Sequence, residues 1–181
     1  MKTYLTYGSA MAGGVFALVM ILYIFGLHSD ASKLGTAQAI QMIGGLGIGI
    51  ACIVLGTKAK RATVPATEEF GYGSALFAGF MIALFASLIG IVTTLLYTQV
   101  INPGMNDLAL QAQIAKREAA GLSSAQIERA EGFMRKMMSP VIQACFGFIF
   151  GLLFGTIISL ITAAFLKREA IEVLDEPPAT A

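Results

Sequence analysis

The longest uncharged stretch of this chain covers residues 71–106 and reads GYGSALFAGFMIALFASLIGIVTTLLYTQVINPGMN. It contains no Asp, Glu, Lys, Arg or His. Because the hydrocarbon core of a bilayer is roughly 30 Å thick, about 20 apolar residues of helix are enough to cross it. The stretch therefore predicts a transmembrane helix.

Three further stretches also contain no charged residue, at residues 3–27, 34–57 and 137–166. Apolar residues make up 56% of the chain and charged residues 13%, whereas about 25% of a soluble domain is charged. The mean hydropathy is +0.76. Continuous apolar runs exclude the alternating strands of a membrane barrel. The sequence thus predicts an all-α polytopic membrane protein whose four transmembrane helices form a bundle.

The expected helix limits follow from the polar and turn-forming residues between the apolar runs. We expect helices at about 6–27, 35–57, 71–101 and 139–166, within one transmembrane domain at 1–170 that is followed by a flexible C-terminal tail at 171–181. The first helix is retained, because its apolar run exceeds the roughly 7–15 residues of a signal-peptide core. The third would be roughly 46 Å long, so it must tilt or project beyond the bilayer core.

The segment 105–138 is the only sizeable extramembrane piece. Ser123 and Gln126 form a predicted capping box, which indicates a helical hairpin between the third and fourth transmembrane helices. On the second arm of this hairpin, one face carries Ile127, Ala130, Met134 and Met137. We interpret this face as a connector that rests on its own protein; the alternative is a partner-docking site.

Small residues recur at every fourth position of two helices. The row on the third helix comprises Gly71, Ala75, Gly79, Ala83 and Ser87. The row on the fourth comprises Gly147, Gly151, Gly155, Ser159 and Ala163. Such rows let helix backbones approach closely in lipid, so they predict tight helix packing, with one row a candidate contact between copies of the chain.

Two weaker patterns concern symmetry and orientation. Tyr7-Gly8-Ser9-Ala10 recurs as Tyr72-Gly73-Ser74-Ala75, each at the start of an odd-numbered helix. This favours a parallel repeat of two helical hairpins, an arrangement also found in some transporters. Lys and Arg residues near the helix ends divide six against six, and the cluster Lys58-Ala59-Lys60-Arg61 favours both termini inside the cell.

No candidate catalytic, cofactor-binding or metal-binding residues emerge. The four cores lack ionisable side chains, whereas proton relays and ion-coupled carriers usually need one there. The uncharged polar residues are expected to form interhelical hydrogen bonds rather than a substrate path. They are Gln38, Gln41, Gln99, Gln143, Thr93, Thr94, Thr98 and Thr156.

The remaining candidates for chemistry lie at the helix ends. A lone histidine cannot make a metal site, so we expect His28 to be solvated. Tyr23 and Tyr97 are expected to be interfacial anchors. An enzyme acting on lipid would rest on His28, Asp30, Glu68 and Glu69. The helix count places His28 on the opposite side of the membrane from the two glutamates, which would leave that site unassembled.

Five segments carry a resemblance to a known family. They are Phe70-Gly71-Tyr72-Gly73-Ser74-Ala75, Asn102-Pro103-Gly104, Ser123-Ser124-Ala125-Gln126-Ile127-Glu128, Met138-Ser139-Pro140 and residues 157–168. In order and spacing the chain resembles the bacterial membrane family called domain of unknown function 4199. The resemblance implies a four-helix protein of the bacterial cytoplasmic (inner) membrane, with an extracytoplasmic helical loop. The resemblance implies no activity and no site residues.

The sequence therefore predicts a non-enzymatic membrane protein that acts as a structural or accessory subunit through helix or loop contacts. Its expected partners are the lipid bilayer and either a second copy of the chain or another membrane protein. The net charge of +1 gives no signature of nucleic-acid binding. The alternative function is a channel or transporter for a small uncharged solute, built from two parallel hairpins.

Overall fold

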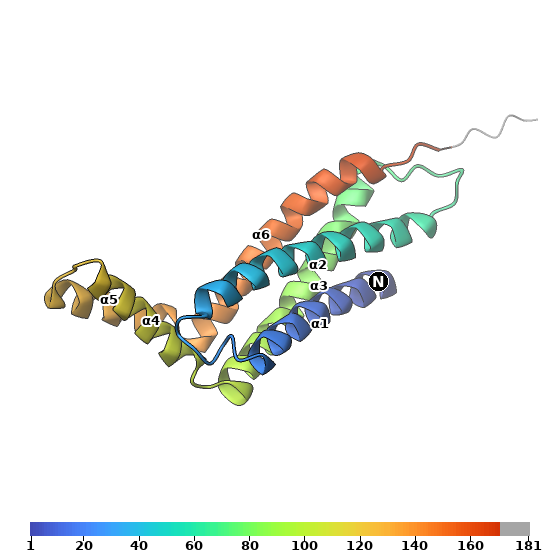
Figure 1. Ribbon diagram of the computed structural model, residues 1–181. Helices are drawn as coiled ribbons and strands as arrows, with labels where there is room; N and C mark the ends of the chain where they lie inside the picture. Colours follow the sequence, from blue (N-terminus) through green and yellow to red (C-terminus); the bar gives the residue numbers. More distant parts are fainter. Residues whose placement is uncertain (171–181) are drawn as a thin grey trace, which may run out of the picture.

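The computed structural model describes residues 1–170 and shows four long helices and two shorter ones (Figure 1). The long helices are α1 (Lys2–Ile24), α2 (Leu34–Ala62), α3 (Tyr72–Leu96) and α6 (Pro140–Leu166). All four are long and apolar enough to cross a membrane. No strand occurs within 1–170, so the predicted all-α fold with four apolar spans is confirmed. The tail predicted at 171–181 lies outside the described residues.

The helix limits differ in places from the expected ones. α2 continues beyond residue 57 to Ala62, because Lys and Arg are good helix formers and stabilise the negative end of the helix dipole. α1 ends before Gly26, which adopts a positive φ of 72°. After Leu96, α3 widens into the π-helical turn η1 (Tyr97–Ile101), and the amide of Asn102 bonds the carbonyl of Tyr97 at 2.8 Å.

α3 lies at the centre of the bundle and contacts α1, α2 and α6. The side chains of Ile53 and Ile82 are fully buried where α2 meets α3. A Cβ added at Gly56 would lie only 2.9 Å from Tyr7 Cγ, so α2 also approaches α1 closely. The aromatic rings of Tyr4 and Phe77 meet edge to face with centroids 6.3 Å apart. α1 and α3 therefore begin at the same end of the bundle.

That end is closed by hydrogen bonds to the chain that follows α6. Phe70 and Arg168 exchange two backbone hydrogen bonds of 2.9 Å each. The Arg168 guanidinium also donates to the carbonyl oxygens of Pro65 at 2.7 Å and Val64 at 3.0 Å. These bonds fix the loop between α2 and α3 against the C-terminal end of α6.

α4 (Met105–Ala119) and α5 (Ser124–Met137) form an arm at the opposite end, where they extend away from the long helices (Figure 1). Gly121, with a φ of 77°, allows the turn between them. The predicted capping box is present, since the Ser123 amide donates to Gln126 Oε1 at 3.0 Å. Ser139 caps α6, and Pro140 occupies its first turn, as the sequence indicated.

Candidate functional site

A cavity of about 370 Å³ lies among the long helices, in the half of the bundle nearer the arm. All four long helices contribute to its lining, together with η1, His28 and the first residue of α4. Along α3 and η1 the cavity extends from Ala86 to Thr98, which is roughly 18 Å of helix. Its volume lies near the lower limit of ordinary small-molecule sites, about 300–1,000 Å³.

The cavity exists because two glycines lie there and no side chain of a neighbouring helix fills the space beside them. Gly90 of α3 and Gly147 of α6 both line it, and no heavy atom lies within 4 Å of a Cβ placed at either position. The wall from α1 is apolar throughout. It consists of Met11, Ala12, Val15, Phe16 and Val19. The result is an apolar pocket formed mainly by α1 and by the glycines of α3 and α6.

Most of the polar lining lies toward the arm, and Ser87 is the exception at the far end. Gln143 of α6 donates to Asn106 Oδ1 at 3.0 Å and to the Met138 carbonyl at 3.2 Å, which ties α6 to α4. Its Oε1 has no hydrogen-bond partner within 1–170, and neither do the side chains of Gln41, Ser87 and Thr94. These groups line the cavity and remain available to a bound molecule.

His28 and Tyr97 form the cavity's end wall. His28 Nδ1 lies 2.6 Å from the Tyr97 hydroxyl oxygen, which also accepts a hydrogen bond of 3.1 Å from Asn102 Nδ2. The hydroxyl proton is therefore free to be donated to Nδ1, an arrangement that leaves the imidazole proton on Nε2. Burial lowers the pKa of His28 below its usual value, so the ring is neutral at pH 7.

Both residues differ from the sequence expectation. The prediction that His28 is solvated is wrong, since the residue is only 3% exposed. Tyr97 is buried as well, at 6% exposed, and its hydroxyl bonds side chains of the chain itself rather than lying at a lipid headgroup. The loop after α1 folds inward across the end of the bundle, a long-range contact that local hydropathy does not indicate.

A second, smaller cavity of about 100 Å³ lies between the start of α2 and α4. It shares three lining residues with the main cavity: His28, Gln41 and Met105. From α4 it receives Ala109, Ala112, Gln113 and Lys116. The two cavities are therefore neighbours that share part of their walls.

The threonines of the spans bond mostly within their own helices. Thr93 donates to the Gly90 carbonyl, Thr98 to that of Thr94 and Thr156 to that of Leu152. The prediction of interhelical bonds is wrong for these three residues, because a threonine hydroxyl reaches the carbonyl three or four residues earlier more easily than a neighbouring helix.

The two rows of small residues face each other along the antiparallel helices α3 and α6. A Cβ added at Gly79 would overlap Ser159, one at Gly155 would overlap Ala83, and one at Gly151 would lie 2.8 Å from Ser87 Oγ. Ala75 and Ala163 are buried as well. The ends of the rows differ: a Cβ at Gly71 would meet only Glu69, and Gly147 faces open space.

The apolar face of α5 is largely covered. Met134 is buried, and Ile127, Ala130 and Met137 are half-buried. At the edge of this face, beside Ala130 and Met137, the Phe133 side chain is 66% exposed. The structure therefore leaves Phe133, at the border of the predicted face, as the large apolar side chain of α5 open to a partner.

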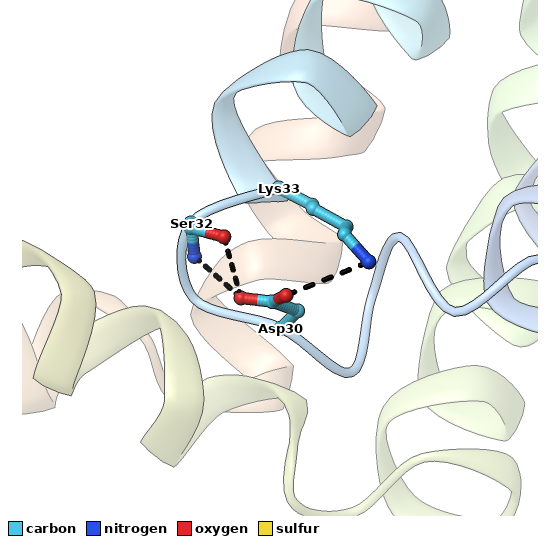
Figure 2. A network of polar contacts seen from close by, with 3 residues as sticks. All are labelled: Asp30, Ser32 and Lys33. Atoms are coloured by element: carbon cyan, nitrogen blue, oxygen red, sulfur yellow. Dashed lines mark hydrogen bonds and ion pairs between the residues drawn. The ribbon is translucent and has the colours of Figure 1, made fainter.

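The charged residues near the helix ends do not assemble into a site. Figure 2 shows Asp30 bonded within its own loop, to the Ser32 amide at 2.9 Å, the Ser32 hydroxyl at 2.7 Å and Lys33 Nζ at 3.5 Å. The Ser32 hydrogen bonds lower the pKa of the Asp30 carboxyl. Glu68 and Glu69 lie in the loop at the opposite end of the bundle (Figure 1). Within 1–170, no three His, Cys, Asp or Glu residues are grouped to hold a metal ion.

A family model described as "Protein of unknown function (DUF4199)" matches residues 6–168, nearly the whole chain. The chain belongs to the DUF4199 family. For this DUF4199 protein no curated protein and no solved structure gives a match. The resemblance noted in the sequence is thereby confirmed, and the match spans all four long helices and the arm between α3 and α6.

Proposed function

We propose that this DUF4199 protein is a non-enzymatic accessory subunit of the bacterial inner membrane. Its partner is another membrane protein, both termini lie in the cytoplasm, and the small-residue rows of α3 and α6 hold the bundle together. The arm supports this proposal most directly. It is a pair of helices with its own capping box that extends from the bundle and exposes Phe133.

The arm has few contacts with the long helices. α4 and α5 contact mainly each other, and the contact between α5 and α6 is small. The arm is thus ordered largely by local contacts rather than by the core. An exposed aromatic side chain on such an element gains free energy when a partner covers it, by about 1.5–3 kcal/mol for full burial. The proposal assigns that contact to α5.

The test is affinity purification of the tagged protein from native membranes, with chemical cross-linking and mass spectrometry. We expect a membrane protein cross-linked to α5, and its recovery should fall with Phe133→Asp. Ala125→Asp is the matched control, because it places the same charge at an exposed position near the start of α5. A chain that is recovered alone from native membranes, with no cross-link to α5, would contradict the proposal.

The main cavity favours a second candidate, a channel or carrier for a small uncharged solute. Its lining comes from both hairpins, α1 with α2 and α3 with α6. Proteoliposomes that contain the protein should then take up glycerol or urea faster than protein-free liposomes. Equal rates for both solutes would remove this candidate.

A further inference from the structure

We propose that the main cavity is a binding site for a small uncharged amphiphile, an organic molecule with an apolar body and one hydroxyl or carbonyl group. This inference goes beyond the accessory role, since binding needs neither a partner protein nor transport. Three properties of the lining carry it: the volume, the absence of charge and the separation of polar from apolar surface.

The volume is too large for a single water molecule. A cavity of about 370 Å³ compares with roughly 30 Å³ per water in the liquid. Apolar residues such as Met11, Ala12 and Ala86 predominate at the end far from the arm, where Ser87 adds a hydroxyl group. Water in contact with such a wall lacks hydrogen-bond partners, so an apolar ligand body would displace it favourably.

The absence of charge selects the ligand's ionisation state. None of the residues that line the main cavity is Asp, Glu, Lys or Arg, and His28 is neutral at pH 7 because burial lowers its pKa. An ion brought into this lining would lose its hydration without gaining a counter-charge. Lys116 borders only the second cavity, nearer the arm. The main cavity is therefore suited to a neutral molecule.

The polar groups select the orientation of the ligand. Gln41, Thr94 and Gln143 offer unpaired donors or acceptors at the end toward the arm, and His28 Nε2 has no partner within the described chain. A hydroxyl or carbonyl group fits this end, while the apolar body lies along α1. The second cavity lies beside α4 at this same end and shares His28, Gln41 and Met105 with the main cavity.

Photolabelling of the full-length protein in nanodiscs tests the proposal. The probe is octanol carrying a diazirine on its alkyl chain, and labelled residues are identified by mass spectrometry. We expect labels on the lining residues of α1 and α3, reduced by an excess of 1-octanol but not by sodium octanoate, which carries the same chain with a charge. Labels confined to lipid-facing positions, or equal competition by octanoate, would overturn the proposal.

Two variants keep the test specific. Gly90→Leu places a side chain in the cavity and should lower labelling of the lining about tenfold, equivalent to about 1.4 kcal/mol. Gly73→Leu is its control on the same helix, because Gly73 lies outside the cavity with open space around it; its labelling should match the wild type. If Gly90→Leu does not fold, Gly147→Leu fills the same cavity from α6. Undiminished lining labels in a folded cavity-filling variant would overturn the assignment.

Discussion

The hydroxyl of Tyr97 joins three parts of the chain. It lies 2.6 Å from His28 Nδ1 in the loop after α1 and accepts from Asn102 Nδ2, which follows η1. A buried polar group left without a partner costs about 1–3 kcal/mol, more than an ordinary hydrogen bond contributes. The Tyr97 hydroxyl therefore helps to hold the α1–α2 loop over the end of the bundle.

Tyr97→Phe should destabilise the protein by about 1–3 kcal/mol, because it leaves His28 without its bond inside the bundle. Unfolding in detergent, followed by circular dichroism, measures the loss. Tyr72→Phe is the matched control, since the Tyr72 hydroxyl bonds the Leu160 carbonyl from an exposed position. We expect about 0.5 kcal/mol or less there. Equal losses in the two variants would contradict the role given to Tyr97.

The same histidine should make the stability of the folded protein depend on pH. Its pKa is lowered by burial in the folded protein, so the unfolded chain binds the proton more readily. Stability should be constant above about pH 7.5 and should fall as the pH drops through the unfolded-state pKa near 6.5. The chain has one histidine. His28→Asn should consequently show a flat profile between about pH 7.5 and 5.5, whatever its absolute stability; a profile as steep as that of the wild type would exclude His28 as the source.

At the scale of the helices, small residues bring α3 and α6 into close contact. Gly79 faces Ser159, and Gly155 faces Ala83. The four-residue spacing of these positions was visible in the sequence because each row lies on one face of one helix. The pairing of Ala83 with Gly155 was not, since it depends on how far two antiparallel helices slide past each other.

Gly155→Leu should destabilise the protein by about 1–3 kcal/mol or more, because even a Cβ at this position overlaps Ala83. Gly147→Leu lies two turns earlier on the same helix and faces open space, so it should fold normally. Size-exclusion chromatography and thermal unfolding in detergent compare the two variants. A stable Gly155→Leu variant with wild-type elution would contradict the observed contact.

Prediction from sequence succeeded for local features and failed for contacts between distant segments. The capping box of Ser123 and Gln126 and the start of α6 at Pro140 depend on neighbouring residues, and both appear as expected. The burial of His28 depends on Tyr97, 69 residues away. The cavity depends on the space left between all four long helices, the α1–α2 loop and the start of α4. No periodicity within one helix indicates such a space.

At the scale of the whole molecule, the two ends of the bundle differ. The end with the α2–α3 loop is closed by Arg168 and tightly packed around Ile53 and Ile82. The end with the arm holds both cavities and the bond between His28 and Tyr97. If four helices cross the membrane, these ends face opposite compartments, and the proposed orientation puts the arm outside the cytoplasm.

Cysteine accessibility in intact cells tests this arrangement most directly. With Cys52 and Cys145 replaced by serine, Ser32→Cys and Ala66→Cys place one thiol in each of the two loops, and both positions are exposed. A membrane-impermeant maleimide should label Ser32→Cys in intact cells and Ala66→Cys only after lysis. The reverse pattern would contradict the proposed orientation, and equal labelling of both in intact cells would contradict the spanning fold itself.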